Sequence, residues 1–563
     1  MENNKYILYL NSLHNYNAQN PNAYGEKNVG SEFFKQIAVK RGISTFVKKQ
    51  LLECEPHLLV LTGHAGDGKT SIMFQVLNEI NSEFNAYEKI SHIILPSGKK
   101  CCCIKDFSEL NDTEKLTVLK QCVEAVNNGE FVFMVSNTGP LINTFGDLFD
   151  VDEREGAKIE LIDCIDDNNG EIKNIKGVKI NIINIASVDN TYFSVEFVEN
   201  MIKPELWNNC KKCDKCDFCH IYRNRNIIYE NKTRVFTFLM EHYIWLVEHG
   251  IRLTVRSMTE QLSYMITGGY ECSQVDSYDR YKMMFFNLFF GYIGLKNNER
   301  ANCILAIREA KNCNYYNKRV RSDEKLLVDG DYSKIFSNEM SAIINEAAEK
   351  DYGLNGWNEF VRRAYLFTNI ITDHKIVSND IEDFFSSQYE RFLEFRNTDI
   401  EPGKSDTNLI LDALSMTYLG KIPDKMNSDI SITMNSKIGL TKNVQLITGS
   451  LNSRKIKLIK QKTKDAIFDS EHKCFELKLQ IEKQNLEGVI SLPILNYFED
   501  LRSGIIETNI DPQLSHGIES LKAQISQEYE DDEDDIVEII VLKNNGNKDY
   551  TLEISDDNKL KPL

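Results

Sequence analysis

The sequence predicts an α/β core of strands and helices, followed by a helical region and a smaller β-rich region. Three changes of pattern along the 563 residues lead to this division. Short apolar runs alternate with helical stretches from residue 58 to about 190, apolar residues recur at helical spacing from about 195 to 418, and short apolar runs return after 427. Buried strands that alternate with helices are typical of a sheet covered on both faces.

The predicted core sheet consists of five apolar runs, each of a length suited to one buried strand. Its strands are expected at 58–61, 92–95, 101–104, 131–135 and 178–185. The residues before the core are expected to form a helical lead-in, in which apolar residues are periodic over 33–47.

Helices dominate the middle of the chain, and strands dominate its last part. Apolar residues at helical spacing predict helices at 236–247, 258–266, 281–292 and 357–368. The later apolar runs predict strands at 430–434, 444–448, 456–459, 474–479, 536–542 and 550–554. An acidic run at 528–535 lies among these strands, where we expect a solvated loop.

A chain of this length is expected to form several domains rather than one. The patterns predict a lead-in at 1–50, an α/β core at 51–195, a cysteine-rich insertion at 196–230, a helical lid or domain at 231–425, and a β-rich domain at 426–563.

Composition and charge exclude several classes of protein. The hydrophobic fraction of 42% is ordinary for a globular protein, and 66 Lys and Arg against 84 Asp and Glu give a net charge of −18. A generally basic nucleic-acid-binding surface is therefore excluded, although a local basic stripe is not. No run approaches the roughly 18 apolar residues that a membrane span requires, and the first residues do not resemble a secretory signal. We therefore expect a cytoplasmic protein without membrane contact, whose thiols stay reduced.

The most informative segment follows the first predicted strand. Residues 63–70, the glycine loop, fit the pattern G-x-x-x-x-G-K-[ST], and an apolar helical stretch follows at 72–80. Glycines allow the backbone angles that turn successive N–H groups towards phosphate oxygens, and the N-terminus of the next helix adds a favourable dipole. The glycine loop therefore predicts a phosphate-binding site in the core of a P-loop NTPase.

Each residue type in the glycine loop has an expected role. Lys69 supplies a charge to the β- and γ-phosphates, and the Thr70 hydroxyl is placed to hold Mg²⁺. The residues expected to bind the nucleotide, ATP, are Gly63, His64, Ala65, Gly66, Asp67, Gly68, Lys69, Thr70 and Ser71. A glycine-rich turn that matches by chance is the alternative, against which the strand before it and the helix after it argue.

Hydrolysis also requires one carboxylate that holds the metal ion and one that activates water. Asp106 directly follows a predicted strand, so we expect it to hold Mg²⁺, with Glu109 orienting or deprotonating the attacking water. Asp163, which follows the apolar run 159–162 and has Asp166 close by, is a competing candidate. Asp106 is preferred because the acid usually follows the loop by one or two strands. An acidic helix cap is the structural alternative for Asp106.

Asn137 follows the buried strand predicted at 131–135. A short polar side chain at such a strand end can touch the γ-phosphate or the attacking water, so Asn137 is a candidate catalytic residue. From spacing alone, an asparagine that turns the loop before Gly139 and Pro140 fits equally well.

Arginines of the helical region are further candidates. An Arg that reaches the γ-phosphate neutralises charge in the transition state. Arg252 and Arg256 open an amphipathic helix, and Arg363 interrupts an apolar one. Arg256 is the preferred catalytic candidate and Arg363 a weaker one, although most arginines are surface or ion-paired residues.

Four of the cysteines form a separate pattern, the four-cysteine segment. Cys210, Cys213, Cys216 and Cys219 make three consecutive C-x₂-C steps, a spacing at which thiolates can converge on one tetrahedral ion. Nearby basic residues are expected to favour thiolate over thiol. Zinc is the expected metal, an iron–sulfur cluster is the alternative, and His220 is an alternative to one thiolate. The metal is expected to act as a structural clip. The remaining cysteines fit small buried hydrophobes.

The order of these motifs resembles P-loop ATPases of the AAA+ and STAND kind from prokaryotic defence systems. The sequence is most similar to the ATPase components of DNA phosphorothioation-dependent restriction, from about Lys40 to its end. The segments that carry the resemblance are 63–70, 105–109, 136–139, the four-cysteine segment, 253–256 and 285–291. The glycine loop is the one sharp motif among them, and the adjacent acid pair that normally ends a strand in such ATPases is missing.

The resemblance implies an AAA+-like ATPase motor or switch that works with partner effector subunits in an anti-phage complex directed at DNA. The absence of a recognisable nuclease motif agrees with cutting by other subunits. The alternative is a nucleotide-gated scaffold that assembles partners with little or no hydrolysis. A small-molecule kinase is disfavoured because no acceptor-binding lid is recognisable. The sequence leaves the oligomeric state open, including a homo-oligomer.

Two local basic clusters are the residue-level support for direct contact with DNA. They consist of Lys311, Lys318, Arg319 and Arg321, and of Lys455, Lys457, Lys460, Lys462 and Lys464. Such clusters are more often solvated faces, so DNA is expected to be reached through the complex.

Overall fold

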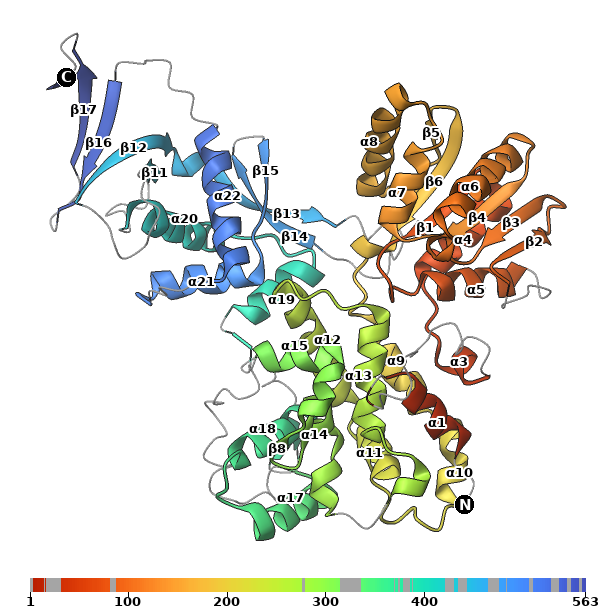
Figure 1. The fold of residues 1–563 in the computed structure, drawn as a ribbon. Coiled ribbons are helices and arrows are strands. Elements are labelled where there is room, and N and C mark those ends of the chain that lie inside the picture. Colours follow the sequence, from red (N-terminus) through yellow and green to blue (C-terminus); the bar gives the residue numbers. More distant parts are fainter. Residues whose placement is uncertain are drawn as a thin grey trace. The chain divides into compact units, whose positions relative to one another are not determined.

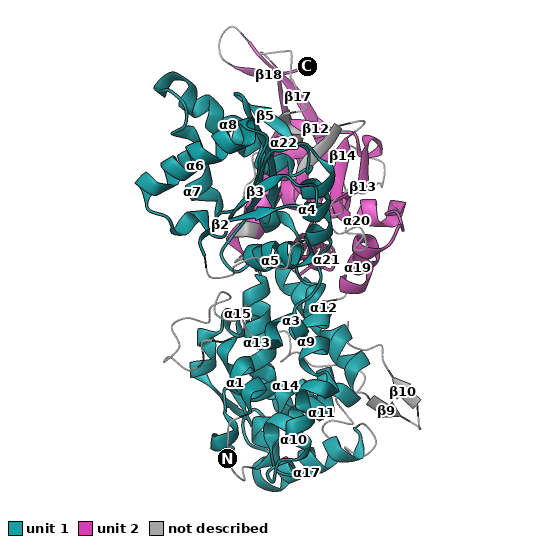
Figure 2. Cartoon of the chain, turned by 90° about the vertical axis from the view of Figure 1, so that its right-hand side faces the viewer, with its two compact units in different colours: residues 1–384, 464–471 teal, residues 385–463, 472–563 magenta. Residues whose placement is uncertain are grey.

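The chain forms two compact units, residues 1–384 with 464–471 and residues 385–463 with 472–563 (Figure 2). The coordinates are those of a computed structural model. It describes residues 4–14, 16, 32–80, 88–275, 279–313, 336–368, 370–372, 375–377, 385–386, 388–420, 430–433, 443–463, 475–481, 484–505, 510–527, 536–543, 548–555 and 559–563.

The first unit contains a six-stranded sheet in the order β2-β3-β4-β1-β6-β5 (Figure 1). Its strands are β1 (Leu58–Thr62), β2 (Ile90–Ile94), β3 (Lys100–Ile104), β4 (Phe131–Val135), β5 (Lys173–Ile175) and β6 (Val178–Asn184). The four central strands β3, β4, β1 and β6 run parallel, and β2 and β5 pair antiparallel at the two edges. The expected α/β fold is therefore confirmed as a parallel-rich sheet with helices. The edge strand β5 was not predicted.

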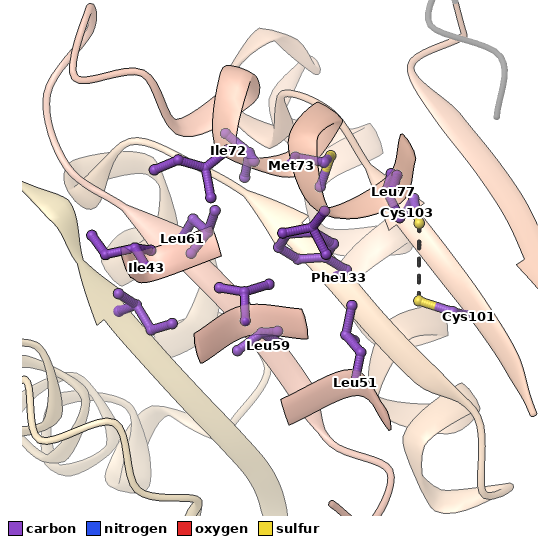
Figure 3. Packing of buried hydrophobic residues seen from close by; sticks show 14 of the residues in the cluster. Ile43, Leu51, Leu59, Leu61, Ile72, Met73, Leu77, Cys101, Cys103 and Phe133 are labelled. Atoms are coloured by element: carbon purple, nitrogen blue, oxygen red, sulfur yellow. Dashed lines mark hydrogen bonds between the residues drawn. The ribbon is translucent and has the colours of Figure 1, made fainter. Parts of the chain in front are cut away.

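Helices cover both faces of this sheet. On one face lie α4 (Gly42–Glu53) and α5 (Lys69–Ile80), and on the other lie α6 (Asp112–Asn127), α7 (Thr138–Gly146) and α8 (Val151–Asp167). Successive residues of β1 alternate between the two cores: Leu59 and Leu61 pack with α4 and α5, as Figure 3 shows, whereas Leu58 and Val60 pack on the opposite face. A strand buried on both faces reads as a continuous apolar run, as this one does.

The helical part of the first unit follows the sheet. Its longer described helices are α9 (Phe193–Met201), α11 (His220–Glu230), α12 (Lys232–Glu248), α13 (Val255–Thr267), α15 (Leu305–Cys313), α17 (Asn338–Asp351) and α18 (Trp357–Phe367). The predicted single helix over 281–292 is wrong. The segment divides into the 3-10 turn η5 (Arg280–Met283), the short helix α14 (Phe285–Phe289) and strand β7 (Tyr292–Ile293), because Met284 is extended and Gly291 has a φ of 70°.

The lead-in contributes helices α1 (Lys5–Ser12) and α3 (Glu32–Ile37). Tyr6 of α1 is buried, its hydroxyl donates to the carbonyl of Met201 at 2.7 Å, and its ring packs on Phe33 and Trp207. These contacts fix α1 against the helical part of the unit rather than leaving it as a separate arm.

The second unit combines two antiparallel sheets with helices. The sheets have the orders β11-β12-β16-β17-β18 and β13-β14-β15. Their strands are β11 (Ile430–Thr433), β12 (Val444–Leu451), β13 (Ile456–Lys462), β14 (Phe475–Ile481), β15 (Gln484–Val489), β16 (Ile536–Val541), β17 (Lys548–Ile554) and β18 (Leu560–Pro562). The helices are α19 (Tyr389–Asn397), α20 (Lys404–Leu419), α21 (Leu492–Arg502) and α22 (Pro512–Gln527).

The second unit begins at Phe385, earlier than the boundary expected at 426, because α19 and α20 belong to it. Helices α21 and α22 lie between its strands and were not predicted. The acidic run 528–535 lies outside the described residues. In the parts of the chain that the structure describes, every helix is too short or too polar to traverse a bilayer.

Candidate functional site

The glycine loop connects β1 to α5, as the sequence predicted. Gly63, Gly66 and Gly68 have φ values of 145°, 94° and 85°, a region that residues with a Cβ rarely adopt. At Gly66 a Cβ would also lie 2.9 Å from the Thr254 Oγ1 atom. Glycine is therefore required here by both the backbone angle and a close approach from α13.

Lys69, the first residue of α5, is folded back over the loop. Its ammonium group donates to the carbonyl oxygens of Gly63 at 3.0 Å and His64 at 2.7 Å, and to Asn137 Oδ1 at 3.0 Å. Burial lowers the pKa of Lys69, while the carboxylates of Asp67 and Asp106 act to raise it. The structure thus brings Lys69 together with Asn137, as the nucleotide-site prediction requires.

Asn137 lies between β4 and α7. Its backbone N–H donates to Ser108 Oγ at 2.7 Å, and its side chain makes no capping hydrogen bond to α7. The side-chain oxygen instead accepts the hydrogen bond from Lys69. Asn137 therefore both begins a helix and presents its amide to the glycine loop.

Asp106 and Glu109 follow β3. Asp106 caps the 3-10 turn η1 (Phe107–Glu109), where its Oδ1 atom accepts a hydrogen bond from Ser108 N at 3.0 Å. The capping alternative is therefore realised, and the same residue also faces the site. The Glu109 carboxylate pairs with Lys89 Nζ at 3.6 Å, and its side chain is 52% exposed.

The order of the strands explains why these residues meet. Strands β3, β4 and β1 are neighbours and parallel, so their carboxyl ends lie at one edge of the sheet. Asp106, Asn137 and the glycine loop each follow one of these ends.

Asp163 is not part of this arrangement. The apolar run 159–162 belongs to α8, and Asp163 and Asp166 are exposed on that helix. Asp163 does not follow a strand of the sheet, so the reason for considering it is lost.

Three arginines contact the glycine loop from outside it. Arg252 Nη2 donates to Asp67 Oδ2 at 3.0 Å, Arg41 Nη1 donates to the Asp67 carbonyl at 3.0 Å, and the backbone N–H of Arg256 donates to the Gly66 carbonyl at 3.1 Å. Asp67 is fully buried, and its Oδ2 atom also accepts a hydrogen bond from His64 N at 2.8 Å. The role of Arg41 was not predicted, because nothing in the lead-in sequence relates it to the loop.

Arg363, the weaker arginine candidate, has a different environment. It is buried in the helical part of the unit, where Nε donates to Asn287 Oδ1 at 2.8 Å and the guanidinium stacks over the Tyr292 ring. These contacts fit a structural role.

A cavity of about 390 Å³ lies beside the glycine loop. Its polar lining includes Gly66, Gly68, Lys69, Thr70, Asp106 and Asn137, and Ala65, Ser71, Glu109 and Arg256 also border it. Its apolar part is lined by Tyr9, Leu13, Phe34, Ile37, Val39 and Phe197. Of the predicted site residues, Gly63, His64 and Asp67 shape the loop without lining this cavity. This lining suits an anionic group beside the glycine loop and a flat apolar group beside the apolar side chains.

The four-cysteine segment is not arranged as expected. Cys216 is turned towards the Asp217 carboxylate, to which its Sγ donates at 3.4 Å, whereas Cys210 is buried and accepts a hydrogen bond from Asn4 Nδ2 at 3.2 Å. Burial raises the pKa of Cys210 to about 12 and also raises the pKa of Cys219, an effect opposite to that expected from the neighbouring lysines.

Cys272, which the sequence analysis did not connect with this segment, lies near it. The charges of Cys213, Cys219 and Cys272 all influence the pKa of Cys210, and Lys215 Nζ donates to the carbonyl oxygens of Cys272 and Val275. The signal in the sequence is a single cysteine after two glycines, which by itself indicates nothing.

The Nε2 atom of His220 lies 3.3 Å from the Thr267 carbonyl oxygen, and burial lowers the pKa of His220 to about 4. Within the described residues, no three His, Cys, Asp or Glu side chains are arranged to hold a metal ion as they stand. The residues as placed do not fit the four-thiol site, and metal binding stays a prediction.

The two basic clusters are only partly described, since Lys318, Arg319, Arg321 and Lys464 lie outside the described residues. Lys311 donates to Asn297 Oδ1 and Asn302 Oδ1, and burial lowers its pKa to about 8. On β13, Lys457 and Lys462 are exposed, whereas Lys460 donates to the carbonyl oxygens of Thr398 and Ile400. Lys311 is therefore engaged inside the fold, and the exposed charge lies on β13.

Comparison with known proteins does not extend these observations: no protein-family model, no curated protein and no solved structure matches the chain.

Proposed function

We propose that the first unit binds ATP with Mg²⁺ and hydrolyses it. One observation carries the proposal: the glycine loop, Asp106 and Asn137 line the same cavity, and Lys69 contacts the Asn137 side chain. A phosphate-binding loop next to an acid and an amide at neighbouring strand ends is the arrangement that phosphoryl transfer to water requires.

Each of these residues has a role in the proposed reaction. Backbone N–H groups at the start of α5 would bind phosphate oxygens, and Lys69 would exchange its present carbonyl acceptors for them. Thr70 and Asp106 would hold the magnesium ion, which neutralises phosphate charge when bound. Asn137 would orient the attacking water and Glu109 would take its proton.

The arginines would complete the site. The Arg256 side chain borders the cavity, and its backbone holds Gly66, so a shift of α13 would move the loop and this guanidinium together. A guanidinium that reaches the γ-phosphate stabilises the charge of the transition state.

The resemblance supplies the proposed context. We place this ATPase in the cytoplasm as a motor or switch subunit of an anti-phage restriction complex, in which partner proteins cut DNA. The exposed lysines of β13 support contact with DNA weakly, because exposed basic side chains are common on strands.

Lys69→Ala tests the proposal directly. We expect it to abolish binding of Mg·ATP and ATP turnover, because a phosphate-binding ammonium is lost. Lys49→Ala is the matched control, since Lys49 is an exposed lysine of α4 with a side chain 67% accessible. Parent-like turnover by Lys69→Ala would refute the assignment, as would equal losses in both variants.

A nucleotide-gated scaffold is the second candidate, and the environment of Glu109 favours it. The carboxylate of the proposed base is half exposed and pairs with Lys89 Nζ, a partner that competes with an attacking water for it. Glu109→Gln separates the two functions: an ATPase loses turnover and keeps ATP binding, whereas a scaffold shows negligible turnover in the parent as well.

A further inference from the structure

Much of the apolar lining of the cavity comes from an unexpected part of the chain. Tyr9 and Leu13 belong to α1 and its end, Phe34 and Ile37 to α3, and Phe197 to α9. None of these segments belongs to the sheet. A nucleotide needs an apolar pocket for its base as well as an anion site for its phosphates.

Within this apolar lining, Tyr9 has a polar atom without a partner. Its side chain is buried, with 6% of the residue exposed, and its hydroxyl finds no hydrogen-bond partner among the described residues. A buried hydroxyl is normally satisfied, so an unsatisfied one on a residue that lines a cavity is a donor that a ligand bound there can engage. Burial raises the pKa of Tyr9, so the phenol keeps its proton and remains a donor.

Tyr6, one helical turn earlier, provides the contrast. Both rings pack against Phe33, with centroid distances of 5.2 Å for Tyr6 and 5.6 Å for Tyr9. The Tyr6 hydroxyl, however, is bound to the Met201 carbonyl, and Tyr6 does not line the cavity. The two tyrosines of α1 therefore share their packing and differ in what their hydroxyl groups do.

We infer that Tyr9 is a base-binding residue that determines nucleotide specificity: the purine base lies in the apolar part of the cavity, and the Tyr9 hydroxyl donates a hydrogen bond to it. This inference rests on the proposed function, because the phosphates must lie beside the glycine loop. A site that hydrogen-bonds one group of a ligand strongly disfavours ligands that lack this group.

The test compares a ligand with a base and one without. Binding of Mg·ATP to the full chain is measured by calorimetry, and Mg·tripolyphosphate is measured by its ability to displace ATP. We expect Tyr9→Phe to weaken ATP binding about tenfold, the effect of one buried hydrogen bond, and to leave tripolyphosphate binding unchanged. Tyr9→Ala should weaken ATP further, with the same tripolyphosphate affinity.

Tyr6→Phe is the matched control. It removes the bond to Met201, so we expect a lower melting temperature and an unchanged ratio of the two affinities. Parent-like ATP binding by Tyr9→Phe overturns the inference, as does an equal loss for both ligands. If the parent binds no ATP, or tripolyphosphate displaces none of it, the proposed function itself fails, an outcome that differs from failure at Tyr9 alone.

Discussion

The glycine loop and the four-cysteine segment are both short motifs with regular spacing, yet only the glycine loop has the arrangement that its sequence predicts. The glycine loop is organised by its own backbone angles and by the strand and helix that flank it. In the four-cysteine segment, Cys216 turns away and Cys272 approaches from after α13. A motif that acts through its backbone can be recognised in sequence, whereas one that needs side chains to converge depends on tertiary contacts.

The largest expected effect concerns the cysteines. If the segment binds zinc, we expect Cys272→Ser to lose the metal and Cys216→Ser to keep it, because the charge of Cys272 acts on Cys210 and Cys219 whereas Cys216 bonds to Asp217. Metal analysis of the purified chains, with an absorption spectrum to detect an iron–sulfur cluster, measures this. If Cys216→Ser alone lost the metal, the four contiguous cysteines that the sequence suggests would be the ligands instead.

Gly66→Ala tests how much the loop depends on its neighbour. The added Cβ would meet Thr254 Oγ1 at 2.9 Å, so the loop must shift, and we expect ATP affinity to fall by about 100-fold. Gly98→Ala is the matched control, since Gly98 has a φ of 79° and nothing within 4 Å of its Cβ position. If both variants bind ATP equally well, contact with α13 does not set the loop geometry.

Glu260, a residue of α13, is expected to make the free energy of unfolding depend on pH. Burial raises the pKa of Glu260 to about 7, although the Arg256 guanidinium lowers it. The pKa of Glu260 is higher in the folded than in the unfolded chain. The stability that the protonated Glu260 carboxyl group contributes is therefore fully present below about pH 4.5 and is lost as the pH rises to about 7. We expect Glu260→Gln to be more stable than the parent at pH 8 by about 3 kcal/mol, with little difference at pH 4.5.

Urea unfolding at several pH values measures this difference. Glu160→Gln, an exposed position on α8, should show no such gain at pH 8. A parent and a Glu260→Gln variant with parallel pH profiles would show that Glu260 titrates as an ordinary carboxyl group.

Arg252→Ala is expected to have the smallest effect. It removes one donor from the buried Asp67 carboxylate and leaves His64 N in place, so we expect a loss of about 1–2 kcal/mol in the free energy of unfolding. Arg308→Ala, on the exposed side of α15, should change it by less than about 0.5 kcal/mol. An unchanged stability of Arg252→Ala would mean that the loop holds Asp67 without help from the helical part.

The sequence predicted the strands that carry the site because each is a continuous apolar run. Leu58 to Leu61 and Phe131 to Val135 could hardly be anything else, and the glycines fixed the turn between β1 and α5. The run 159–162 lies in α8, and its four residues alone cannot distinguish a strand from one turn of a helix.

The contacts around the site could not be predicted. Arg41 and Arg252 meet Asp67 from segments far away in the sequence, and Cys272 has no local feature that marks it. Such pairings follow from how the helices pack on the sheet, which periodicity does not specify.

Helix α1 contacts the four-cysteine segment and also borders the cavity beside the glycine loop. Its capping residue Asn4 donates to Cys210, Tyr9 borders the cavity, and Ile7 and Leu10 of the same helix are buried. At 1.5 Å per residue, its eight residues span only about 12 Å. Trimming the N-terminus during protein preparation would therefore strip a thiol of its donor and remove part of the cavity wall in one step, so samples for binding or metal assays should keep these first residues.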